Sequence, residues 1–333
     1  MKRYLRPLGL LSGTAARDGL ALPLAGGPLG FSLVEIIERI APGDIRRRIV
    51  PAQDVAGELT RHIGSRPVAA PIVMGIVNAT PDSFSDGGAH FDAGAAIAHA
   101  TAMIQAGAGI VDIGGESTRP GAIPVPVDEE IRRIVPVIAG IRDAGVTISI
   151  DTRNARTMQA ALDAGAAMIN DVSALTHDPA SPAVAARAAG PVVLMHMQGE
   201  PATMQQAPAY DDVVLDVYDA LETRIAAALA AGIALDRIVV DPGIGFGKTI
   251  AHNLALLAGL SLFHGLGVPL LVGVSRKGFI ARLSAAEPAD QRLGGSLAAG
   301  LAAVGQGAQI LRVHDASETL QSLRVATAIR EAF

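Results

Sequence analysis

The sequence contains no cysteine and no tryptophan, and it has only 3 tyrosines and 7 phenylalanines among 333 residues. Without cysteine, neither a disulfide framework nor a thiolate metal site can form. Because aromatic residues are scarce while 50% of the chain is apolar, Ala, Val, Ile and Leu must fill the core. This composition suits parallel strands that are covered on both faces.

An excess of positive charge is also lacking, since the formal net charge is −5. This balance argues against a nucleic-acid partner, which would favour a basic face. No apolar run approaches the ~20 residues needed to span a bilayer. The segment Met1–Pro7 carries basic residues but no apolar stretch follows, so a signal peptide is not expected. These absences predict a soluble cytoplasmic protein with neither nucleic-acid nor membrane partners.

Eight short apolar runs recur after residue 70, and nearly all end in a polar side chain. A (β/α)8 barrel, or TIM barrel, places the carboxyl ends of its strands around one pocket mouth, so the runs predict both a fold and a site. A doubly wound open sheet is the competing fold, but eight comparable units over residues 72–333 favour closure. The runs are Pro71–Val77, Gly109–Ile113, Val146–Ile150, Ala167–Ile169, Pro191–Met195, Arg237–Val240, Pro269–Val274 and Ala308–Leu311.

Helical segments are expected between these runs. Asp92 is a candidate N-cap for a helix over 93–106 that Gly107 ends. Two long connections, 78–92 and 114–127, follow strands and therefore lie on the active face, where long loops are usually lids or binding loops. Further helices are expected near 129–143, 154–164, 211–231, 252–264, 292–306 and 315–331.

The chain divides into a small N-terminal extension, 1–68, and a barrel, 69–333. Within the extension, Phe31–Ile40 has the pattern of a short amphipathic helix. The run Arg46–Arg48 is short enough to be a solvated face rather than a binding patch. Nothing in this extension indicates its role.

Two apparent motifs do not hold. Asp241–Thr249 resembles a phosphate loop, but Pro242 occupies a position where the Walker pattern requires glycine. We instead expect its glycines to let the backbone approach a ligand closely. The 8 histidines show no H-E-x-x-H or other close metal-ligand spacing.

Two groups of side chains at the strand ends carry chemistry. Asp151, Asn170 and Asp241 suit a flat ligand with several N–H donors, although any one of them could be a helix cap. The other group is cationic and suits a phosphate-bearing substrate, with Ser117 and Thr118 as further donors. Surface salt bridges are the alternative, and they fit Arg276 better than Arg312. The cationic group is Arg119, Arg276, Lys277, Arg312 and His314.

Several motifs closely resemble signatures of the dihydropteroate synthase family. MGIVNATPDSFSDGG at 74–88 resembles the first signature, and DIGGESTRPG at 112–121 resembles the second. The resemblance continues in order to residue 333 and leaves out the N-terminal extension. It implies a transferase of folate biosynthesis that joins 4-aminobenzoate to (7,8-dihydropterin-6-yl)methyl diphosphate. Further matches are ISIDT at 148–152, IND at 169–171, DPGIGFGK at 241–248, GVSRK at 273–277 and RVHD at 312–315.

The resemblance also implies roles for residues. Asn78 would help to hold Mg²⁺ on the diphosphate, and Asp86 would stabilise the cation formed on the pterin methylene. Asp86, Arg119, Lys277 and Arg312 are the expected catalytic residues. The expected substrate contacts are Asp151, Asn170, Asp241, Phe246 and Lys277 at the pterin, Thr118, Arg119, Arg312 and His314 at the diphosphate, and Phe84, Ser117 and Pro120 around the aminobenzoate.

Two positions depart from the family. Ala79 replaces a larger aliphatic residue, and Gly278 stands where many members carry a hydroxyl near the aminobenzoate carboxylate. Backbone N–H groups would have to make that contact here. The family further suggests a homodimer through barrel helices and sulfonamides as ligands.

Two other functions compete with the synthase. A barrel that transfers methyl from a methyltetrahydrofolate to a corrinoid protein would share Asp151, Asn170 and Asp241. Such a barrel has no use for the diphosphate site that the loop at 117–121 and the pair Arg312 and His314 indicate. A catalytically silent, pterin-binding paralogue is the third interpretation.

Overall fold

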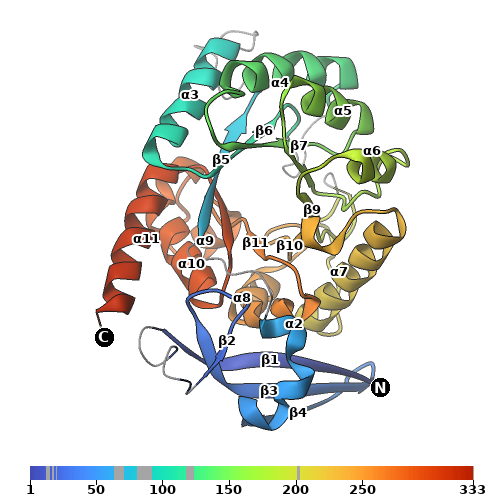
Figure 1. The fold of residues 1–333 in the computed structure, drawn as a ribbon, viewed down its shortest axis with the longest axis vertical. Helices are drawn as coiled ribbons and strands as arrows, with labels where there is room; N and C mark the ends of the chain where they lie inside the picture. Colours follow the sequence, from blue (N-terminus) through green and yellow to red (C-terminus); the bar gives the residue numbers. More distant parts are fainter. Residues whose placement is uncertain are drawn as a thin grey trace.

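The computed structural model describes residues 1–12, 16, 19, 21–63, 71–80, 92–117, 124–200 and 203–332. Eight parallel strands follow one another in the order β10-β9-β8-β7-β6-β5-β12-β11, and a bridge from Val240 to Leu270 joins the two ends. This arrangement confirms the predicted (β/α)8 barrel and excludes the open sheet (Figure 1). The strands are β5 (Ile72–Asn78), β6 (Ile110–Gly114), β7 (Thr147–Asp151), β8 (Met168–Asp171), β9 (Val192–Met195), β10 (Ile238–Asp241), β11 (Leu271–Val272) and β12 (Ile310–Val313).

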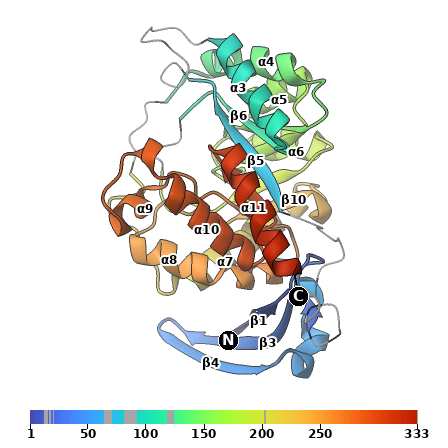
Figure 2. The same cartoon turned by 90° about the vertical axis from the view of Figure 1, so that its left-hand side faces the viewer.

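Helices surround the strands, as Figure 2 also shows. The predicted cap is confirmed, because the Asp92 side chain accepts a hydrogen bond from the Gly94 N–H at 2.8 Å. The predicted helix 252–264 is wrong in its second half, since Gly259 ends α8 and a 3-10 turn, η4 (Leu260–Leu266), follows. No helix in the described ranges is long and apolar enough to cross a membrane. The helices are α3 (Ala93–Ala106), α4 (Val127–Ile141), α5 (Ala155–Ala164), α6 (Ser181–Arg187), α7 (Val213–Ala230), α8 (Ile250–Ala258), α9 (Gly278–Leu283), α10 (Leu293–Gly305) and α11 (Ala316–Glu331), with 3-10 turns η3 (Leu235–Arg237) and η5 (Ala289–Gln291).

Two of these helices, α6 and α9, were not expected from the sequence. Both are short, and neither has the apolar periodicity that reveals the longer helices. The remaining strands and helices of the barrel agree with the prediction.

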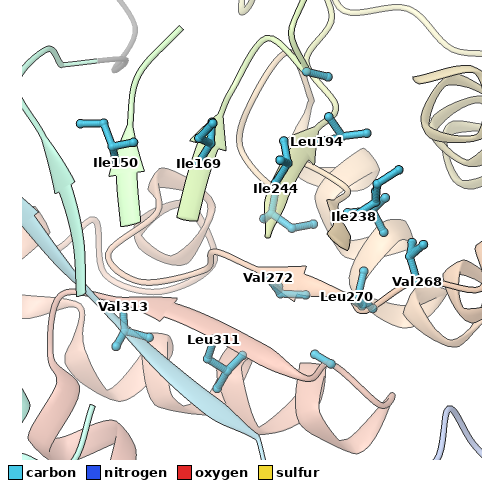
Figure 3. Packing of buried hydrophobic residues seen from close by; sticks show 14 of the residues in the cluster. Ile150, Ile169, Leu194, Ile238, Ile244, Val268, Leu270, Val272, Leu311 and Val313 are labelled. Atoms are coloured by element: carbon cyan, nitrogen blue, oxygen red, sulfur yellow. The ribbon is translucent and has the colours of Figure 1, made fainter. Parts of the chain in front are cut away.

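Side chains along each barrel strand alternate between the barrel interior and the surrounding helices. The outward set packs under the helices in the main core, and Figure 3 shows Ile150, Ile169, Leu311 and Val313 among them. The inward set forms a separate apolar layer. That layer consists of Met74, Ile110, Met168, Val193, Val239, Leu271 and Ile310.

A polar layer lies directly above this apolar one. Two residues after Ile110, Met168, Val239 and Ile310 come Asp112, Asn170, Asp241 and Arg312. Because the side-chain period of a strand is two, these polar groups also point into the barrel, one layer closer to the carboxyl ends. The strand pattern therefore places the polar groups on a closed apolar floor.

The N-terminal residues form an antiparallel sheet, and the predicted helix over Phe31–Ile40 is wrong. These residues belong to β3 (Gly30–Ala41), which pairs with β1 (Lys2–Leu11) on one side and with β4 (Asp44–Pro51) and β2 (Leu22–Pro23) on the other. Phe31, Val34 and Ile36 pack in one cluster, whereas Ile37 packs in the main core. Burial on both faces produces an apolar spacing that imitates a helix. The 3-10 turn η1 (Ala52–Glu58) and the short helix α2 (Thr60–Ile63) complete this part.

Charged side chains attach this sheet to α7. The Asp219 carboxylate lies 2.6 Å from Lys2 Nζ and accepts a hydrogen bond of 2.8 Å from the Tyr4 hydroxyl. Arg39 Nη2 lies 2.6 Å from the Asp216 carboxylate. The N-terminal sheet is therefore fastened to the side of the barrel by hydrogen-bonded ion pairs along one helix.

Two histidines are buried where this part meets the barrel. His62 is 5% exposed and its Nε2 donates to the Leu5 carbonyl at 2.7 Å. His264 is 1% exposed and its Nε2 lies 3.3 Å from the Gln306 carbonyl. Burial lowers the pKa of each from 6.5 to about 4. Both rings are therefore neutral at pH 7.

Candidate active site

A cavity of about 790 Å³ opens at the carboxyl ends of the barrel strands. The structure brings together in its lining the predicted residues that lie in the described ranges. Phe84, Asp86, Thr118, Arg119 and Pro120 lie outside the described residues. The predicted residues that line the cavity are Asn78, Ser117, Asp151, Asn170, Asp241, Phe246, Lys277, Arg312 and His314.

Arg312 lines the bottom of this cavity and is held there by two carboxylates, Asp151 in the lining and Asp112 buried behind it. Its Nε lies 2.6 Å from Asp112 Oδ2 and its Nη2 lies 2.6 Å from Asp151 Oδ2. Asn170 Nδ2 donates to the same Asp112 oxygen at 3.0 Å. The three strands β6, β7 and β12 are thus cross-linked at one guanidinium group.

Asp112 is the residue that the sequence analysis missed. It lies inside a strand rather than at its end, so a search of strand ends passes over it. Asp112 lies two residues after Ile110, so both side chains point to the same face of the strand. Because Ile110 belongs to the inward apolar layer, this spacing predicts that Asp112 points into the barrel. A buried carboxylate in that register must be paired, and Arg312 is its partner.

Two carboxylate oxygens of this group are buried without a hydrogen-bond partner among the described residues, Asp112 Oδ1 and Asp151 Oδ1. Burial raises the pKa of Asp151, although the charge of Arg312 acts in the opposite direction. Burial also opposes the charge of Arg312, but Asp112 and Asp151 outweigh that effect and raise its pKa further. Buried acceptors usually have a partner, and at Asp151, which lines the cavity, a ligand with N–H donors can supply one.

Asp241 and Lys277 form a second polar pair of the cavity wall. The Asp241 carboxylate accepts a hydrogen bond from the Gly243 N–H at 2.7 Å, and burial raises its pKa against the effects of that bond and of Lys277. Lys277 Nζ lies 4.2 Å from the centre of the Phe246 ring. The Lys277 cation packs on the Phe246 ring, and together with the Asp241 carboxylate it offers a donor and an acceptor to a planar polar ring in the cavity.

Two glycines of the loop after β10, Gly243 and Gly247, pack against the backbone of the loop after β9. The prediction that the glycines approach a ligand is therefore wrong for these two. A Cβ at Gly243 would lie 1.9 Å from the His196 carbonyl oxygen, and a Cβ at Gly247 would lie 2.5 Å from that of Gln198. Both glycines also have positive φ, 68° and 60°. The backbone of this loop therefore rests directly on residues 196–198.

Two charged residues that follow barrel strands, Arg276 and Glu116, have structural partners. Arg276 forms an ion pair with Asp315, in agreement with the salt-bridge alternative considered for it. Glu116 accepts a hydrogen bond from the Val125 N–H at 3.1 Å and lies 3.3 Å from Arg153 Nε. Glu116 therefore links the end of the β6 strand segment to Val125, on the two sides of residues 117–124.

His314 and Ser275 occupy the rim near β11 and β12. His314 Nδ1 lies 3.1 Å from the Ser275 hydroxyl, which also accepts from the His314 N–H at 3.2 Å. Gly278 begins α9 in the same wall, and a Cβ there would meet nothing within 4 Å. The wall thus has room where the sequence departs from the family pattern.

Comparisons with known proteins agree with this geometry. A sequence model described as "Pterin binding enzyme" matches residues 74–314. The dihydropteroate synthase of Escherichia coli is 48% identical over 269 residues, which cover 80% of this chain and 95% of the relative. The Xanthomonas albilineans dihydropteroate synthase structure with 4-aminobenzoic acid has 47% identity and a TM-score of 0.75, covering 85% of this chain and 96% of that one. A Yersinia pestis dihydropteroate synthase structure with a sulfonamide drug has 46% identity and a TM-score of 0.75, covering 80% and 96%.

Proposed function

The chain belongs to the dihydropteroate synthase family of pterin-binding enzymes, and from that membership we propose how its own residues perform the reaction. The enzyme joins the amine of 4-aminobenzoate to the methylene carbon of (7,8-dihydropterin-6-yl)methyl diphosphate. The products are 7,8-dihydropteroate and diphosphate. The observation that carries the assignment to this site is the polar layer above the apolar floor of the barrel, in which the buried Asp151 Oδ1 has no partner among the described residues and lines the cavity.

We propose that the pterin ring lies over this layer. A pterin has an amino group and ring N–H donors on one edge, and Asp151, Asn170 and Asp241 offer the matching acceptors. Lys277 would donate to a ring acceptor, while the Phe246 ring packs against Lys277 Nζ. Asp112 would not touch the ring directly, because it is fully buried and holds Arg312 and Asn170 in place.

The diphosphate would lie at the rim, near His314 and the exposed edge of Arg312. Thr118 and Arg119 would add donors from the second loop. A magnesium ion fits here without a complete protein ligand set, because Mg²⁺ commonly takes most of its oxygens from phosphate and water. Among the described residues no three His, Asp or Glu side chains gather as a metal site, but Asn78 places an amide oxygen in the cavity wall. When bound, Mg²⁺ would neutralise the charge of the departing diphosphate.

We propose that the carbon–oxygen bond breaks before the new bond forms. The electron pair leaves with the diphosphate, and positive charge develops on the pterin methylene. Cationic side chains at the rim stabilise the leaving group most as it departs. The amine of 4-aminobenzoate then attacks the methylene carbon and loses its proton. Asp86 would stabilise the transient cation, and the residues around it, with Ser117–Pro120, would exclude water.

The test is diphosphate release by purified protein given the pterin diphosphate and Mg²⁺, with and without 4-aminobenzoate. We expect release that depends on 4-aminobenzoate, with dihydropteroate as the product. Pterin binding without turnover would instead identify a silent paralogue. Asp86→Ala should bind the pterin normally and turn over slowly, and unchanged turnover would remove Asp86 from the mechanism.

Two further properties follow from family membership. We propose that sulfonamides compete with 4-aminobenzoate, which competition kinetics will measure. We also propose a homodimer formed through barrel helices, with the Ala-rich helix α10 as a candidate surface. Light scattering will give the molar mass, and the mass of a single chain would refute the dimer.

A further inference from the structure

Lys248 is a buried lysine that the proposed reaction does not use. It is 3% exposed and lies where the loop after β10 rests on the loop after β9. Its Nζ lies 2.8 Å from the Phe246 carbonyl, 3.3 Å from the His196 carbonyl and 3.0 Å from His196 Nδ1. One side chain thus connects the two loops through three polar contacts.

These contacts can be satisfied in both protonation states of the amine. A charged ammonium group donates to the two carbonyls and to an unprotonated Nδ1. A neutral amine donates to the two carbonyls and accepts from a protonated Nδ1, because the imidazole tautomer can change. Burial lowers the pKa of Lys248 to about 7, so both states are accessible near neutral pH. The bridge between the loops therefore survives across this pH range.

Every carbonyl from residue 245 to 247 is held by a side chain. Gln205 donates to the Gly245 carbonyl at 2.6 Å, and the Tyr210 hydroxyl donates to that of Gly247 at 2.8 Å. Lys248 holds the one between them, which belongs to Phe246. Phe246 is also the residue whose ring faces Lys277 Nζ at 4.2 Å. Lys248 therefore acts on the backbone of the residue that supports a pterin-binding side chain.

We propose that Lys248 is a positioning residue for substrate binding, which fixes the Phe246 ring under Lys277 by tying the Phe246 carbonyl to His196. The proposal rests on the proposed function for the identity of the ligand. It assigns Lys248 no contact with the reacting atoms. Loss of the amine should consequently weaken binding of the pterin and leave the chemical step nearly unchanged.

The test is Lys248→Met, which keeps the length of the side chain and removes its donors. We expect KM for the pterin diphosphate to rise about tenfold, because small displacements of a positioning group have effects of this size, while kcat stays within about twofold. The control is Thr157→Val, which removes a buried hydrogen bond of 2.6 Å to Glu130 between α4 and α5; neither residue lines the cavity. Thr157→Val should lower the free energy of unfolding without changing KM.

An unchanged KM in Lys248→Met, or a decrease in kcat alone, would overturn the proposal.

A double-mutant cycle with Phe246→Ala tests whether the effect passes through Phe246. In the Phe246→Ala background, Lys248→Met should raise KM by less than about twofold, since the ring that it positions is gone. The full tenfold increase in that background would overturn the proposal.

Hydrogen exchange separates failure of this proposal from failure of the proposed function. Amides 243–248 should exchange faster in Lys248→Met than in Thr157→Val, whether or not the wild type turns over. If the wild type releases no diphosphate, the proposed function fails and the exchange rates still test the bridge. Equal exchange in the two variants would overturn it.

Discussion

Lowering the pH from 7 to 5 should destabilise this protein through the two buried histidines between its N-terminal sheet and its barrel. His62 and His264 each donate through Nε2 to a backbone carbonyl, and each has its Nδ1 buried without a partner among the described residues. A proton added to Nδ1 would bring a charge into a site without an acceptor. Arg61 further disfavours the charge on His62, and His62 disfavours the charge on His264.

The sign follows from the pKa values. Each folded-state pKa is about 4, below the value of 6.5 for an accessible histidine. As the pH falls below 6.5, the unfolded chain binds protons that the folded chain does not, so folding stability falls until the pH approaches 4. Between pH 7 and pH 5 the loss is about 2 kcal/mol for each histidine.

The assay is urea unfolding followed by circular dichroism at pH 7 and at pH 5. The wild type is compared with the double variant His62→Gln and His264→Gln, in which glutamine can still donate to the carbonyl. Because other titrating groups are common to both proteins, the difference in pH dependence isolates the two histidines. His177→Gln, at an exposed position, is the matched control. The same loss between pH 7 and pH 5 in wild type and double variant would refute the reasoning.

Four other predictions concern the site and the N-terminal sheet. Arg312→Met leaves Asp112 and Asp151 without their counter-charge, so urea unfolding should show a loss of about 3 kcal/mol and calorimetry should show no pterin binding. Asp219→Asn weakens the contacts with α7 and should lower the free energy of unfolding by about 1–2 kcal/mol, measured in the same way. Gly278→Ser places a hydroxyl where the wall has room, and steady-state kinetics should show KM for 4-aminobenzoate reduced by roughly threefold, about the value of one modest hydrogen bond. Removal of Mg²⁺ by a chelator should reduce turnover at least about tenfold, and added Mg²⁺ should restore it, because a bound metal contributes several kcal/mol of charge stabilisation.

The barrel and much of the site could be predicted because parallel strands bury both faces and end in a common plane. Residues such as Asp151 and Asp241 stand at those ends, where apolar sequence changes to polar. Asp112 was missed because the polar layer includes a residue inside a strand. At such a position, only the two-residue alternation of side chains shows that Asp112 points into the barrel. The strand β3 was mistaken for a helix because the sheet partners that bury its two faces are far away in the sequence. Such long-range burial overrides the local pattern.

The close seating of Gly243 and Gly247 on residues 196–198 limits how this cavity can change during evolution. Any side chain at either glycine would collide with a backbone carbonyl, at 1.9 Å and 2.5 Å. The backbone path of this loop, which carries Gly245 and Phe246 in the cavity wall, therefore cannot be changed by replacing Gly243 or Gly247 alone. An inhibitor that binds the backbone of this loop contacts a surface that replacement of either glycine cannot reshape without a clash. Resistance to it would have to arise at neighbouring side chains of the lining such as Met204, where the backbone imposes no comparable restriction.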